Sequence, residues 1–163
     1  MAEYLRREGY VSLDRLRELR ARIWVVRVRE PRVTTVTFDN ALDFGLEAKD
    51  LVADDHGACQ VFAERCRSEA QMPEVIRVPN AALPGTENLV IFGPRTLAPY
   101  LSVPIDQVDV PGSLVAEGAH PLHSLLEHVR YLGEPHPALE AWKRGTAYDF
   151  EEPSTALIGT GLQ

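Results

Sequence analysis

The apolar and polar positions along the chain predict short strands mixed with helices. The clearest helix covers 58–70, where apolar and small residues recur at helical spacing at Cys59, Phe62, Ala63, Cys66 and Ala70. β-branched and aromatic residues predict strands at 23–30, 32–38, 74–78 and 88–92. A further strand at 101–110 contains Pro104 and is expected at a sheet edge. Because strands and helices do not alternate strictly, the pattern predicts an α+β fold with a mixed sheet and flanking helices.

The remaining amphipathic stretches predict further helices. They cover 2–8, 13–22, 46–55, 120–132 and 137–145. The character of the chain changes after a Pro-Gly-Ser turn at 111–113, where strand patterns give way to helical ones. We therefore expect a main domain over 1–110 and a C-terminal helical extension and tail over 111–163, packed on that domain.

Charge is distributed unevenly along the chain. The net charge is −7, yet residues 1–32 carry nine arginines against five acidic residues. The acidic remainder argues against broad nucleic-acid binding, which needs many cations to neutralise phosphates. The basic N-terminal part is compatible with contact to a phosphorylated ligand or an acidic partner, whereas most of its arginines are expected on a solvated helix face. No stretch is long and apolar enough to predict a membrane span, and the N-terminus does not resemble a secretory signal, so we expect a cytoplasmic protein.

Sequence motifs exclude several kinds of site. The chain lacks a GxGxxG after a strand, a GxxxxGK[ST] loop and a GxSxG elbow. Four histidines, His120, His123, His128 and His136, have spacings of 3, 5 and 8 rather than the spacing of 4 that brings ligands together on a helix. A solvated, histidine-bearing helix is favoured, and no metal is expected. Cys59 and Cys66 lie about 10 Å apart along one helix, so they are interpreted as core residues.

The segment VPNAALPGTENLVIFGPR, residues 78–95, joins two predicted strands through an unusually rich turn. Its turn-forming residues are Pro79, Asn80, Pro84, Gly85 and Asn88. This is more than a simple strand reversal needs. A ligand-facing loop and a purely structural loop are both compatible with the pattern.

From about residue 22 to residue 100, the order of these features resembles the RES domain, found in NAD-consuming toxins of bacterial toxin–antitoxin pairs. The resemblance runs through IWVVRVREPRVTTVTF, LDFGL and DLVADDHGACQVFAERCRSEA, and it is most specific in VPNAALPGTENLVIFGPR. It implies an ADP-ribosyltransferase-like domain whose loop in the segment 78–95 lines an NAD pocket.

The resemblance also implies roles for individual residues. Glu3, in MAEYLRREG, falls at the position of the family's glutamate, which stabilises positive charge on the nicotinamide ribose. Asn80 replaces the family's serine and is able to hydrogen-bond a ribose hydroxyl or phosphate. Asn88 is assigned to NAD binding, and Arg27 and Arg29 to the pyrophosphate. The family's arginine, which lies upstream of the glutamate, has no counterpart before Glu3, so the domain is expected to be incomplete at its N-terminus.

Two hypotheses follow. In the first, the protein cleaves the N-glycosidic bond of NAD and passes ADP-ribose to phosphate, water or a protein, with Glu3 and Asn80 in the catalytic site. In the second, it is an inactive RES-like module that binds an antitoxin-like protein or a second copy of itself.

Overall fold

The computed structural model describes residues 2–9, 15, 18–25, 33–92, 106–111 and 125–150. The helices are α1 (Ala2–Glu8), η1 (Ala41–Phe44), η2 (Ala48–Val52), α3 (Gly57–Ser68), α6 (Leu125–His128) and α7 (Pro137–Lys143), of which η1 and η2 are 3₁₀ helices. The strands are β1 (Arg20–Val25), β2 (Val33–Thr35), β3 (Val75–Pro79), β4 (Glu87–Ile91) and β5 (Asp106–Pro111). The expected α+β fold is confirmed.

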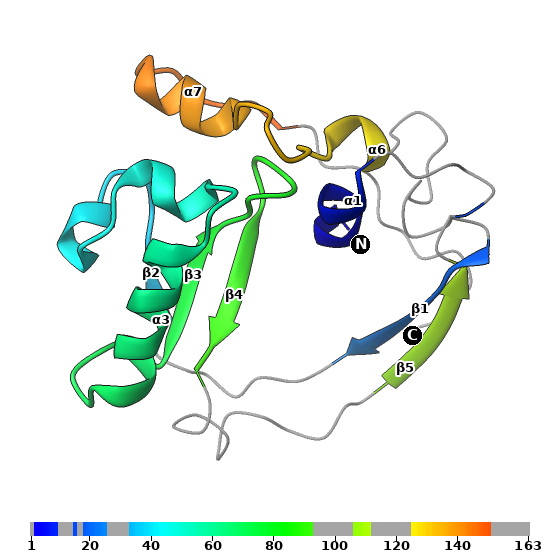
Figure 1. Cartoon of the computed structure of the whole chain (residues 1–163). Coiled ribbons are helices and arrows are strands. Elements are labelled where there is room, and N and C mark those ends of the chain that lie inside the picture. The colour runs from blue at the N-terminus through cyan, green and yellow to red at the C-terminus, as the bar shows by residue number, and fades with distance from the viewer. Residues whose placement is uncertain are drawn as a thin grey trace.

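The described strands form two sheets. β2 runs parallel to β3, and β3 runs antiparallel to β4 with Val78 opposite Asn88. This mixed sheet packs against α3 (Figure 1). β1 and β5 form a separate antiparallel pair with Arg20 opposite Pro111. Pro104, on which the expected edge position rested, lies outside the described residues, so that position stays a prediction.

The main core lies between α3, η2 and the three-stranded sheet. Phe62 and Cys66, on the inner face of α3, meet Ile76 of β3 and Phe92 just after β4. The helical spacing predicted this face correctly at Phe62 and Cys66, whereas Ala70 lies beyond the end of α3 and is exposed. Phe62 also contacts the Phe44 ring edge to face, with centroids 5.9 Å apart. Burial of these apolar side chains therefore fixes α3 on one face of the sheet.

A second, smaller core joins three distant parts of the chain. Ala2 and Leu5 of α1 pack with Ala82 of the loop after β3 and with Val129 after α6. Figure 1 shows α1 and α6 side by side near the tip of the β3–β4 hairpin. This cluster brings the N-terminal helix and the C-terminal segment to the loop.

Several predicted helices are wrong at their ends. The helix predicted at 46–55, for example, is the shorter 3₁₀ helix η2. The helix predicted at 120–132 ends at His128, because Val129 enters the small core and the Arg130 N–H donates to the carbonyl of Ala82 (2.9 Å). The helix predicted at 13–22 overlaps β1, which starts at Arg20, because the ladder with β5 overrides local helix propensity there. Within the described ranges, no helix has the length and apolar content to cross a membrane.

Candidate functional site

The loop between β3 and β4 is held in one shape by its own hydrogen bonds. The side-chain Oδ1 of Asn80 accepts from the backbone N–H groups of Ala82 (2.9 Å) and Leu83 (3.1 Å). The Asn80 N–H donates to the carbonyl of Thr86 (2.9 Å), and the Thr86 N–H and hydroxyl both donate to the carbonyl of Leu83. Gly85, with φ of 89°, supplies the left-handed position that the turn requires. We call residues 80–86 the hairpin loop.

Asn80 therefore closes the turn with its amide oxygen, and its amide nitrogen is left for other partners. Asn88 lies opposite Val78, so it shares a sheet face with Val78 and Val90. Those two valines, with Phe62 and other apolar side chains, line a pocket of about 240 Å³ between α3 and the sheet. An amide therefore lies on the sheet face that forms this apolar pocket.

A charge cluster that contains two buried arginines lies next to the hairpin loop. Arg6 of α1 is 3% exposed and donates through Nη2 to Asp54 Oδ1 (2.7 Å) and to the carbonyl of Ala53 (3.1 Å). Arg130 is 8% exposed, and its Nη1 lies 2.9 Å from the same Asp54 oxygen. The Gly133 N–H donates to the other oxygen of Asp54 (2.7 Å). We call Arg6, Asp54 and Arg130 the charge cluster.

The Asp54 carboxylate is the acceptor that makes this arrangement stable. Burial raises the pKa of Asp54, but the hydrogen bond from Gly133 and the charges of Arg6 and Arg130 outweigh burial, so the pKa lies below its usual value of 3.8. Two guanidinium groups this close would repel each other without the carboxylate. The cluster thus ties α1 and the C-terminal segment to the turn at 53–54.

His136 connects the C-terminal segment to the hairpin loop. It is 4% exposed, its Nε2 donates to the carbonyl of Asn80 (3.1 Å), and its Nδ1 accepts from the N–H of Leu139 (3.2 Å). This pattern requires the neutral ring with its proton on Nε2. Burial lowers the pKa of His136, and the charges of Arg130 and Arg6 lower it further, although the Asn80 hydrogen bond opposes the shift. The prediction of a solvated histidine is wrong here, because His136 caps α7 from the interior.

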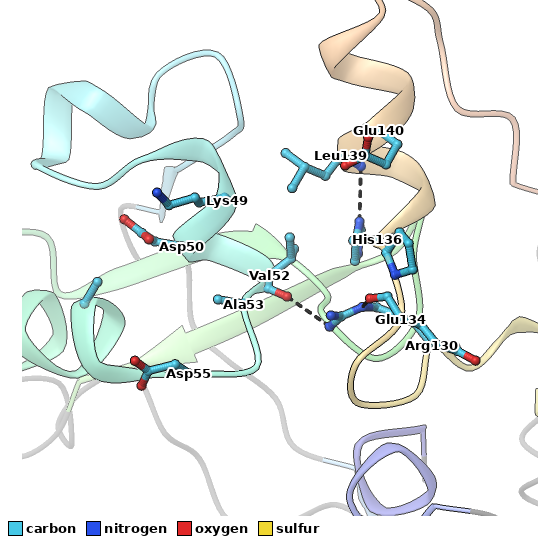
Figure 2. A pocket seen from close by; sticks show the side chains of 12 residues that line it. Lys49, Asp50, Val52, Ala53, Asp55, Arg130, Glu134, His136, Leu139 and Glu140 are labelled. Atoms are coloured by element: carbon cyan, nitrogen blue, oxygen red, sulfur yellow. Dashed lines mark hydrogen bonds between the residues drawn. The ribbon is translucent and has the colours of Figure 1, made fainter.

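Two open clefts flank the charge cluster. Figure 2 shows Arg130 and His136 on one side of the first cleft, with Val52 and Ala53 facing Arg130. This cleft has a volume of about 410 Å³ and carries side chains of both charges. The second cleft, of about 610 Å³, runs along α1 and is lined by Glu3, Arg6, Arg7, Glu8, Tyr4, Asp54, His56 and Leu132.

The structure separates the residues that the sequence assigned to one site. Glu3 is 55% exposed at the α1 cleft, 3.6 Å from Arg6 Nη1. Asn80 holds the hairpin loop, and Asn88 lies in β4. Arg27 and Arg29 lie outside the described residues, as do His120 and His123. In the described ranges, His, Cys, Asp and Glu form no group of three able to hold a metal ion.

The sequence analysis missed the charge cluster and the role of His136. Asp54 was interpreted as the end of a helix, and Arg130 as part of one. One local signal was available: Pro137 directly follows His136, and proline is favoured at the first position of a helix, which makes His136 an N-cap. The partners of Arg6 and Arg130 are far away in sequence and left no local signal.

Together, these features define an α+β domain in which the hairpin loop adjoins the charge cluster. The model of the RES domain family matches residues 1–111, which is more than half of the chain. The chain therefore belongs to the RES domain family, and the suspected resemblance is confirmed. No curated protein and no solved structure matched the chain.

Proposed function

We propose that this protein cleaves the bond between nicotinamide and ribose in NAD and transfers ADP-ribose to phosphate, water or a protein. Membership of the RES domain family carries the proposal, because the resemblance implies consumption of NAD. The glycosidic C–N bond breaks and its electron pair leaves with neutral nicotinamide. An oxygen of the acceptor then bonds to the ribose carbon and gives up its proton to solvent or to a nearby base.

The proposed catalytic carboxylate is Glu3. The reaction builds positive charge on the ribose ring, and a carboxylate placed beside that ring stabilises it. The exposed position of Glu3, in a cleft of about 610 Å³, supports this role because ligand sites commonly have volumes of about 300–1,000 Å³. Arg6 forms an ion pair with this carboxylate, with Arg6 Nη1 3.6 Å from Glu3 Oε2.

The proposed contacts to NAD use the hairpin loop and the neighbouring strands. The free amide nitrogen of Asn80 is suited to donate to a ribose hydroxyl or a phosphate oxygen. Asn88 has no hydrogen bond from its side chain to any other described residue, which leaves it available to a ligand. Arg27 and Arg29 are proposed for the pyrophosphate, where a guanidinium makes charge-assisted hydrogen bonds.

The kinetics of Glu3→Gln against Glu8→Gln test this function. Both residues lie on α1 and line the same cleft, but only Glu3 is proposed to act on the ribose. We expect Glu3→Gln to lower kcat for nicotinamide release about 100-fold or more with little change in KM. Glu8→Gln should stay within about twofold of wild type. Equal rates for the two variants would remove Glu3 from the catalytic site.

A second candidate function is an inactive RES module that binds a partner. The amide oxygen of Asn80 accepts two hydrogen bonds inside the hairpin loop. The residue at the family's serine position therefore stabilises the turn in this protein. The partner would be an antitoxin-like protein or a second copy of the chain, in the bacterial cytoplasm. Calorimetry distinguishes the two, since only the first function requires NAD to bind. Sedimentation tests self-association of the free chain.

A further inference from the structure

The C-terminal segment 129–150 contacts the hairpin loop at three points. The Arg130 N–H donates to the carbonyl of Ala82 (2.9 Å), and His136 Nε2 donates to the carbonyl of Asn80 (3.1 Å). At the third point, Phe150 lies against Gly85. This segment follows the region matched by the RES domain family, which ends at residue 111. These three contacts to the loop thus come from residues outside the part of the chain that matches the family.

The contact at Gly85 is close enough to exclude any other residue. A Cβ atom placed on Gly85 would lie 2.3 Å from Phe150 Cβ and 3.1 Å from Tyr148 Cε1. Atoms of this kind do not approach so closely, so Phe150 packs directly on the backbone of the loop. One side of the loop is therefore covered by the C-terminal segment.

The segment is itself anchored to the domain by Arg130. Its Nη1 donates to the carbonyl of Val52 (3.0 Å), and its Nε donates to the carbonyl of Glu134 (2.8 Å). The same guanidinium pairs with Asp54, which also holds Arg6 of α1. Arg130 thus holds the C-terminal segment on the domain. His136 connects that segment to Asn80, at the start of the hairpin loop.

We propose that His136 is a positioning residue that sets the geometry of the hairpin loop for its ligand, through the hydrogen bond from Nε2 to the carbonyl of Asn80. In its link to NAD, this inference rests on the proposed function. Asn80 is the centre of the turn, because its N–H and its side chain both close the loop. Displacement of its carbonyl shifts the amide nitrogen that is proposed to contact NAD. His136 itself touches no ligand in this role.

The neutral form of His136 is the one that makes both hydrogen bonds, to Asn80 and from Leu139. A second proton would go to Nδ1, which would then lose its ability to accept from Leu139. Arg6 and Arg130 both disfavour the extra charge. The other charged groups that share its cleft are Lys49, Asp50, Asp55, Glu134 and Glu140. Burial is the largest influence on His136 and lowers its pKa.

Two substitutions separate the two roles of His136, the hydrogen bond to the Asn80 carbonyl and the cap of α7. In His136→Asn, the shorter side chain keeps an oxygen near the position of Nδ1, so it still caps α7 but does not reach Asn80. In His136→Gln, the longer side chain places an N–H near the position of Nε2, so it still reaches Asn80 and caps α7 poorly. The pair is therefore matched, with one function retained in each variant.

The first readout is hydrogen exchange of the hairpin loop in the full chain without NAD. We expect the Ala82 and Leu83 amides to lose about tenfold in protection factor in His136→Asn and to stay near wild type in His136→Gln. Unchanged protection in His136→Asn, with loss in His136→Gln, would make His136 only a cap and overturn the proposal.

The second readout is the dissociation constant of NAD by calorimetry. We expect about tenfold weaker binding in His136→Asn and nearly wild-type binding in His136→Gln. Equal affinity in wild type and His136→Asn would overturn the link between His136 and the ligand. If wild type itself does not bind NAD, the proposed function fails, while hydrogen exchange still decides whether His136 positions the loop.

Discussion

Substitution of Asp54 by asparagine is expected to destabilise the protein strongly. The carboxylate receives hydrogen bonds from Arg6 (2.7 Å) and Gly133 (2.7 Å), and Arg130 lies 2.9 Å from it. Asparagine keeps the shape and removes the charge, so two buried guanidinium groups lose their counterion. Loss of one partner from a buried ion pair costs about 3–5 kcal/mol.

The exposure of Asp54 sets the magnitude within that range. Its side chain is 35% exposed, so solvent screens part of the interaction. We therefore expect a loss near the lower end, about 3 kcal/mol in the free energy of unfolding. Small domains are stable by about 5–15 kcal/mol, so such a loss would be easily measured.

Urea unfolding at pH 7 measures this loss, with Asp55→Asn as the control. Asp55 is the neighbouring acid, and its Oδ1 only accepts from the Gly57 N–H (3.0 Å), a bond that asparagine preserves. We expect Asp55→Asn to stay within about 0.5 kcal/mol of wild type. If Asp54→Asn were as stable as Asp55→Asn, the charge cluster would contribute nothing to the fold.

Further expected outcomes concern the core, the hairpin loop and pH. Phe62→Ala should cost about 3–5 kcal/mol in urea unfolding, whereas Val61→Ala, at an exposed neighbouring position, should cost less than about 1 kcal/mol; equal losses would contradict the assignment of the core face. Gly85→Ala combines a positive φ with a clash against Phe150, so the melting temperature should fall by several degrees; a rise would contradict the described packing. Because the pKa of His136 is lowered from 6.5, the unfolded chain takes up a proton that the folded chain resists, and stability should fall as the pH drops below about 6.5. In His136→Asn, the urea midpoint should not show this fall in stability at low pH. The same pH dependence in the variant and the wild type would contradict the assignment of the fall to His136.

Local patterns predicted the parts of the fold that local physics determines. The spacing of Phe62 and Cys66 identified the buried face of α3, because a helix places residues three and four apart on one side. The β-branched runs identified β3 and β4, and turn-forming residues marked the loop between them.

The candidate site depended on contacts that no local pattern contains. His136 and its hydrogen-bond partner Asn80 are 56 residues apart in the sequence, and Arg130 and its partner Val52 are 78 residues apart. Spacing rules place side chains on a face of one element and say nothing about which distant carbonyl that face will meet. For the same reason, the helix predicted through Arg130 was wrong there, since a tertiary hydrogen bond to Ala82 replaces the helical one.

Asn80 shows how far a resemblance can guide such an assignment. The sequence marked it as a departure from the family's serine, and its assignment to NAD stays a prediction. The structure adds that its amide oxygen closes the hairpin loop. Asn88 and Glu3 likewise keep their assignments as predictions, each beside a different cavity.

The most direct measurement is mass spectrometry of NAD incubated with the purified chain and inorganic phosphate. The proposed function predicts that nicotinamide appears together with an equal amount of ADP-ribose or its phosphate adduct, at a rate proportional to the protein concentration. Intact NAD after prolonged incubation with a folded chain would contradict it and favour the inactive binding module.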